Sequence, residues 1–357
     1  MCDHDGVERR TNGGGTASGA AHVARVRRSQ TSSGATPSST KVPAPASRTP
    51  AGATRSDRAR AASAPVPWLR GPGRHLSAWT VLLLTGLTAL AFVLPGGARG
   101  VIAVVALACL GLASGWSALA RSRVSRIDAS IIALAGVATA AVVGTTGEMS
   151  WAPALMGVSV VALVTVEIFT APSPHDHSRP DGTAPGAPPP QWLRAGSFPT
   201  MAVAVTAVPI AVGGASWAAL AWNQGWSETT LLACAVTAVV VIGDQIGRTF
   251  RTQSLAALVV GVVAGLVVAS VVAWAGSAGQ LVPTVLPALA GIVGESAALV
   301  LHGVLTGIAV SLAVIAVDAL FGEHRRPTSR SGAIARGCAK FLVSAVPVYM
   351  MMRIGGA

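Results

Sequence analysis

The stretches Val81-Leu82-Leu83-Leu84 and Val101-Ile102-Ala103-Val104-Val105 decide which solvent surrounds this chain. They belong to a series of apolar segments that begins at about Ala78 and continues to the end of the sequence. Several of these segments run for roughly 18 or more residues almost without charge, which is long enough to cross about 30 Å of hydrocarbon as a helix. The sequence therefore predicts an all-α, polytopic integral membrane protein.

The composition agrees with a membrane environment. Of the 357 residues, 52% are hydrophobic and 11% are charged, whereas soluble domains carry about 25% charged residues. The formal net charge of +12 does not indicate nucleic-acid binding, because the basic residues occur in the N-terminal tail and in short loops between apolar segments. This distribution is the positive-inside pattern that orients membrane helices, so no nucleic-acid partner is expected.

Hydropathy divides the chain into four regions. Residues 1–76 form a basic tail rich in Ala, Ser, Pro and Arg, which is predicted to be disordered because it has too little apolar surface to offset the entropy of ordering. Residues 77–171 hold spans one to four, residues 172–198 form a Pro-rich linker, and residues 199–357 hold the remaining spans. The spans are expected near 77–95, 100–120, 129–146, 151–171, 199–222, 229–246, 254–275, 295–321 and 338–354.

The apolar region 282–321 is too long for one helix and has no clear loop for two. If it crosses twice, the basic residues that follow it fall outside, which violates the positive-inside rule; if it crosses once, they fall inside. These basic residues are Arg325, Arg326, Arg330, Arg336 and Lys340. We therefore expect a short interfacial or re-entrant piece at 283–294 and one long span after it. The result is about nine spans in the plasma membrane, with the N-terminus in the cytoplasm.

Charged side chains inside spans are costly and are functional candidates by default. Glu295 and His302 are seven residues apart, so they lie two turns apart on one helix face. They could form a proton relay or help to bind a cation. The alternative is a carboxylate at a helix end and a polar contact between two helices.

Asp244 and Asp318 each lie near the predicted cytoplasmic end of a span, and each is followed by arginines. An Asp at a membrane face can hold a divalent metal, and a neighbouring Arg can hold phosphate. Both aspartates are therefore candidate catalytic residues and metal ligands. The candidate phosphate-binding residues are Arg248, Arg325 and Arg326. The alternative is that all of these are snorkelling charges at helix ends.

Three motifs in residues 68–353 resemble those of the phosphatidate cytidylyltransferases, the CDP-diacylglycerol synthases. Asp244 followed by Gly247-Arg248 resembles an Asp near a Gly-Arg pair in that family. Asp318-Ala319-Leu320 followed by Arg325-Arg326 is similar to its Gly-Asp-Leu-x-x-Ser-x-x-Lys-Arg stretch. The run Ala345-Val346-Pro347-Val348-Tyr349 resembles its final span.

The resemblance implies a transferase that converts phosphatidic acid and CTP to CDP-diacylglycerol at the cytoplasmic face, with Mg²⁺ held by Asp244 and Asp318. The chain departs from the family in residues 327–337, which contain no acidic residue where the family has several. Because acidic ligands hold the Mg²⁺ that neutralises CTP phosphates, a catalytically degenerate member is included in this hypothesis. A shorter stretch, Pro327-Thr328-Ser329-Arg330-Ser331-Gly332-Ala333, is similar to a motif of undecaprenyl-diphosphate phosphatases.

Three classes of function remain open at this point. The first is the transferase relative, with membrane lipids, phosphatidic acid and CTP as partners. The second is a transporter or permease in which Glu295 and His302 face an aqueous path. The third is a non-catalytic membrane scaffold whose N-terminal tail is the working part. Copies of the chain could associate, but the sequence does not determine an oligomeric state.

Overall fold

The computed structural model describes residues 72–94, 96–120, 124–170, 197–222, 226–247, 249–275, 291–321 and 329–355. All of them belong to one compact unit, Pro67–Ala357. Most of the predicted tail, and the predicted linker as far as residue 196, lie outside the described residues.

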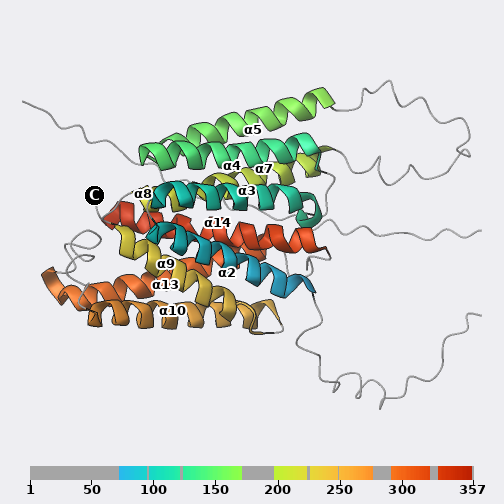
Figure 1. The fold of residues 1–357 in the computed structure, drawn as a ribbon. Coiled ribbons are helices and arrows are strands. Elements are labelled where there is room, and N and C mark those ends of the chain that lie inside the picture. Colours follow the sequence, from blue (N-terminus) through green and yellow to red (C-terminus); the bar gives the residue numbers. More distant parts are fainter. Residues whose placement is uncertain are drawn as a thin grey trace, which may run out of the picture. The chain divides into compact units, whose positions relative to one another are not determined.

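The described part of the chain is helical and contains no strand (Figure 1). In chain order the helices are α2 (Pro72–Val93), α3 (Gly97–Ala120), α4 (Arg126–Thr146), α5 (Trp151–Thr170), α7 (Ser197–Gly213), α8 (Ala215–Trp222), α9 (Ser227–Gly243), α10 (Phe250–Trp274), α13 (Glu295–Phe321) and α14 (Arg330–Gly355). Eight helical segments in this part are long and apolar enough to cross a membrane, and α7 and α8 together form one of them. Helix α9 is a further apolar helix in this part of the chain and is shorter than these eight. The prediction of an all-α, multi-pass membrane protein with about nine spans is confirmed.

Helix α13 agrees with the expected single long span, because it is one helix of 27 residues. Of the interfacial piece predicted at 283–294, only residues 291–294 are described. They form a short helical turn that ends at Gly294, whose φ of 86° separates it from α13. Glycine adopts such a left-handed conformation without the steric cost that a side chain imposes.

The last helix begins earlier than the sequence analysis predicted. Helix α14 starts at Arg330 and not near residue 338. Ser329 Oγ accepts a hydrogen bond from the Gly332 amide at 3.1 Å, which satisfies one of the N–H groups that a first helical turn leaves free. Arg336, which lies before the predicted span, is therefore part of a membrane helix, and Lys340, which the positive-inside argument counted at the inner end of that span, lies ten residues into the helix. Helix α2 likewise begins inside the predicted tail, at Pro72.

Helix α14 lies against α2, α3, α7, α8, α9 and α13 and is thus the centre of the bundle (Figure 1). Small residues allow this close approach. A Cβ atom at Gly337 of α14 would lie 2.6 Å from the Ser77 carbonyl oxygen of α2, and a Cβ atom at Gly115 of α3 would collide with the Ser331 carbonyl group. The side chains that α14 carries are consequently held between helices from both halves of the chain.

Helices α10 and α13 form the second close contact of the bundle. Gly261 and Gly265 of α10 lie against the backbone of Gly307 and Gly303 of α13, at the four-residue spacing that brings membrane helices together. Ser311 Oγ adds a hydrogen bond to a carbonyl oxygen of α10, at 2.9 Å. This contact, here called the glycine seam, fixes the two helices that carry Gln253 and Asp318.

We predict that Gly265→Ala destabilises the protein, because the new Cβ atom would overlap the Gly303 carbonyl oxygen. Overpacking of this kind costs ~1–3 kcal/mol. The matched control is Gly157→Ala in α5, where nothing lies within 4 Å of the new Cβ atom. Thermal unfolding of the detergent-solubilised protein measures the difference. A Gly265 variant as stable as the Gly157 variant would contradict the close packing of α10 on α13.

Candidate functional site

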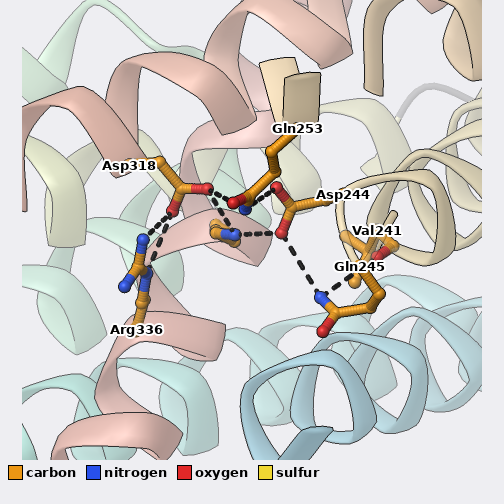
Figure 2. A network of polar contacts seen from close by, with 7 residues as sticks. Val241, Asp244, Gln245, Gln253, Asp318 and Arg336 are labelled. Atoms are coloured by element: carbon orange, nitrogen blue, oxygen red, sulfur yellow. Dashed lines mark hydrogen bonds and ion pairs between the residues drawn. The ribbon is translucent and has the colours of Figure 1, made fainter. Parts of the chain in front are cut away.

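Two carboxylates from distant parts of the sequence share one ammonium group (Figure 2). Lys340 Nζ of α14 lies 2.5 Å from Asp244 Oδ2, just after α9, and 2.9 Å from Asp318 Oδ2 of α13. Two further side chains join them in a cluster that we call the ion network, and Gln245 Nε2 at its border donates to Asp244 Oδ2 at 3.4 Å. Its members are Asp244, Gln253, Asp318, Arg336 and Lys340.

Every carboxylate oxygen of the ion network accepts a hydrogen bond. Arg336 donates to Asp318 Oδ1 from Nε at 3.0 Å and from Nη2 at 2.7 Å. Gln253 Nε2 donates to Asp244 Oδ1 at 2.6 Å and to Asp318 Oδ2 at 3.3 Å. Lys340 Nζ donates to the Oδ2 atom of each aspartate. Two anions and two cations thus form a group without net charge.

Local sequence explains how these residues meet. Arg336 and Lys340 are four residues apart and share one face of α14. Asp244 directly follows α9, and Gly247, with a φ of 115°, turns the chain so that α10 begins only a few residues later. Gln253 lies in the first turn of α10 and so returns to Asp244. All of these positions, and the last turn of α13, are at one end of the bundle, which we call the network side.

The ion network is buried, and Arg336 is its most exposed ionised member. The exposed fraction of the side chain is 14% for Arg336 and 3–4% for Lys340, Asp244 and Asp318. Charges with so little access to water persist only when they are paired and hydrogen-bonded. A guanidinium group carries five N–H donors, and in the described residues Arg336 uses only the edge that faces Asp318. Figure 2 shows a terminal nitrogen of Arg336 directed away from that carboxylate.

The structure brings Asp244 and Asp318 together at one end of the bundle, as the metal-site hypothesis required. Lys340 Nζ, however, lies between them in the place where Mg²⁺ was expected. Mg²⁺ needs several oxygen ligands in octahedral geometry, and the described residues contain no group of three or more His, Cys, Asp or Glu side chains that could hold a metal ion. The ion network in this arrangement does not fit a Mg²⁺ site.

The other candidate residues are outside the described part of the chain or away from the ion network. Arg248, Arg325 and Arg326 lie outside the described residues. Glu295 is exposed at the start of α13, whereas His302 is buried with 3% of its surface exposed. His302 Nε2 has no hydrogen-bond partner among the described residues, so no hydrogen bond from this atom joins it to Glu295.

Three members of the network were not among the predicted site residues: Gln253, Arg336 and Lys340. A signal was present, because Arg336 and Lys340 have the four-residue spacing of one helix face. This spacing was not used, because basic residues next to apolar segments were counted only toward membrane orientation. Gln253 carries no charge and has no motif around it, so nothing in the sequence marked it.

Comparison with known proteins adds no family to this description. No protein-family model, curated protein or solved structure matches the chain. The resemblance to phosphatidate cytidylyltransferases therefore stays a prediction from residue patterns.

We predict that Lys340→Met strongly destabilises the protein, because it leaves two buried carboxylates without their shared cation. Removing one partner of a buried ion pair costs ~3–5 kcal/mol. The double variant Lys340→Met with Asp244→Asn should recover part of this loss, because it removes one anion together with the cation. The control is Arg353→Gln, an exposed charge near the other end of α14. Unfolding in detergent measures all four proteins, and equal stability of the single and double variants would contradict the pairing.

Proposed function

We propose that the chain is a phosphatidate cytidylyltransferase-like protein of the plasma membrane that binds the headgroup of phosphatidic acid at the cytoplasmic face and does not carry out the metal-dependent transfer. The observation that carries the proposal is the position of Lys340 between Asp244 and Asp318. An ammonium group there occupies the place of a metal ion between the two carboxylates, and Arg336, which pairs with Asp318, is the second cation and has N–H groups left at the edge of the cluster.

Charge distribution supports a cytoplasmic position for the network side. The connections on this side, and the helix starts that follow them, are rich in arginine, which the positive-inside rule associates with the cytoplasm. These arginines are Arg248, Arg251, Arg325, Arg326 and Arg330. The same basic surroundings favour an anionic headgroup over a neutral or cationic one.

Arg336 is suited to bind a phosphate group. Its inner edge is fixed by two hydrogen bonds to Asp318 Oδ1, so the guanidinium plane is oriented before a ligand arrives. Its remaining N–H groups match the oxygen spacing of phosphate, which arginine binds in a bidentate manner. In this proposal Arg336 contacts the phosphate, Asp318 positions Arg336, and Asp244 holds Lys340 beside them.

Exposed apolar side chains next to the network favour a lipid over a soluble phosphate. Leu320 follows Asp318 by two residues and is 50% exposed, and Leu255 follows Gln253 by two residues and is 62% exposed. In a membrane such side chains contact acyl chains. A lipid can therefore place its tails against α10 and α13 while its headgroup reaches the network side.

Nucleotidyl transfer from CTP requires a metal ion, and the network lacks free acidic ligands to hold one. CTP phosphates are neutralised by a metal ion that acidic side chains hold. Residues 327–337 contain no acidic residue, and both buried aspartates are already occupied by Lys340, Arg336 and Gln253. If Mg²⁺ were bound, it would neutralise charge at the leaving diphosphate. Asp244 and Asp318, paired as they are with other side chains, do not fit this ion.

We predict that the purified protein in lipid nanodiscs binds phosphatidic acid in preference to phosphatidylcholine and that Arg336→Gln loses this preference. A hydrogen bond to a charged group contributes ~1.5–3 kcal/mol, so affinity should fall by about tenfold to a hundredfold. The control is Arg353→Gln, which removes an exposed arginine near the opposite end of α14. Native mass spectrometry counts the lipids that each protein retains.

The same preparation tests the absence of transfer. With CTP, phosphatidic acid and Mg²⁺, the wild-type protein should form no CDP-diacylglycerol under conditions in which a known synthase is active. Turnover that is lost in Asp318→Ala would overturn this part of the proposal and would show that a metal displaces Lys340. Equal retention of phosphatidic acid by the wild type and Arg336→Gln would overturn the binding site itself.

A further inference from the structure

Gln253 of α10 contacts both buried aspartates of the ion network (Figure 2). Its Nε2 atom lies 2.6 Å from Asp244 Oδ1 and 3.3 Å from Asp318 Oδ2. Ionised carboxylates only accept hydrogen bonds, so the NH₂ end of the amide, and not its oxygen, must face them. Lys340 bridges the same two carboxylates. The pair of aspartates is thus held together by two N–H donors, one neutral and one charged.

The backbone fixes Gln253 in this position. Its amide N–H donates to the Thr249 carbonyl oxygen at 3.0 Å, and the capping pair Thr249 and Thr252 closes the first turn of α10. Gly247, in a left-handed conformation, comes so close that a Cβ atom there would lie 2.8 Å from Gln253 N. The glycine seam then holds α10 against α13. A side chain of similar length at position 253 is therefore expected to reach the same two carboxylates.

A neutral side chain at position 253 keeps the ion network in charge balance. The two carboxylates are matched by the guanidinium group of Arg336 and the ammonium group of Lys340. Charges as deeply buried as these tolerate an excess of either sign poorly. Glutamate has the same length as glutamine and differs only at the end that faces the aspartates, where it carries oxygen in place of NH₂. A glutamate in this position would add a third carboxylate and a third negative charge.

Divalent metal ions such as Mg²⁺ and Mn²⁺ need oxygen ligands, and Gln253 presents hydrogen atoms instead. In the part of the chain that the structure describes, no three His, Cys, Asp or Glu side chains are grouped so that they could hold a metal ion. The N–H groups of Gln253 and Lys340 are directed at the carboxylate oxygens that such an ion would use. We propose that Gln253 is a specificity-determining residue, which makes the ion network accept the protein's own ammonium group and reject a divalent metal ion.

Two substitutions reverse the two properties that exclude the metal ion. Lys340 supplies the positive charge between the aspartates, and Gln253 withholds an oxygen ligand. Lys340→Met leaves two carboxylates with one guanidinium group. Gln253→Glu then raises the excess to two negative charges, which is the charge that one divalent ion neutralises. This preference goes beyond the binding of phosphatidic acid and does not depend on it.

Mn²⁺ binding to the full-length protein in detergent tests the role of Gln253, because no lipid headgroup takes part. Lys340→Met with Gln253→Glu is compared with Lys340→Met alone, so that both proteins lack the lysine and differ only at position 253. The matched control is Lys340→Met with Gln245→Glu. It adds the same charge at the border of the network, where Gln245 Nε2 lies 3.4 Å from Asp244 Oδ2. The electron paramagnetic resonance signal of free Mn²⁺ gives the number of ions bound per chain.

We expect one Mn²⁺ per chain in the Gln253→Glu double variant and none in the wild type. Binding should be at least about tenfold weaker in Lys340→Met alone and in the Gln245→Glu control, because the number of charged oxygen ligands tunes the affinity for a divalent ion. Equal affinity of Lys340→Met with and without Gln253→Glu would overturn the role of Gln253. A folded double variant that binds no Mn²⁺, or a wild type that binds one ion per chain, would overturn it as well.

A second measurement keeps Lys340 in place, because Lys340→Met is expected to be unstable. The network of Gln253→Glu alone carries one excess negative charge, so Mn²⁺ should raise the unfolding temperature of this variant. The wild type and Gln253→Leu should not respond to the ion. If size-exclusion chromatography shows that the double variants do not fold, an equal response of Gln253→Glu and the wild type would overturn the inference. Retention of phosphatidic acid is measured separately, so its outcome leaves this test unchanged.

Discussion

The pairing of Lys340 with two buried carboxylates is the interaction on which the rest of the structure depends. Asp244 and Asp318 are almost completely buried, and a carboxylate in that position is tolerable only beside a cation. The cations Arg336 and Lys340 come from α14, which begins at Arg330 and carries them into the bundle. Because Gln253 bridges the same carboxylates, the network ties α9, α10, α13 and α14 together at one end.

Hydropathy was sufficient to predict the membrane class, the approximate spans and the single long helix α13, because each depends on neighbours in sequence. Asp244 and Asp318 were singled out for the same reason, as charges in apolar surroundings. Their partner could not be predicted in this way. Lys340 is 96 residues from Asp244 in sequence, and which helix faces which is decided by side-chain packing, such as the glycine contacts of α3 and α13, that no local pattern describes. The positive-inside rule counted Arg336 and Lys340 only as charges on the inner side, because it considers the sign and position of a charge but not its pairing.

The bundle combines a dry, tight contact with a polar one. At the glycine seam, backbones approach so closely that a methyl group does not fit, and this rigidity keeps Gln253 and Asp318 in register. Along α9 and the half of α13 that is distant from the ion network, buried hydroxyl and imidazole groups have no hydrogen-bond partner among the described residues. The close packing of α10 on α13 thus fixes the helices that carry two members of the ion network.

The most direct test of this account asks whether an ammonium group or a metal ion neutralises the two aspartates. Calorimetric titration of the purified protein with Mg²⁺, compared with Asp318→Asn, answers the question. The account predicts no stoichiometric Mg²⁺ binding that depends on Asp318, because Lys340 already occupies the position between the carboxylates. One Mg²⁺ bound per chain in the wild type and none in Asp318→Asn would contradict it and would restore the metal-dependent transferase hypothesis.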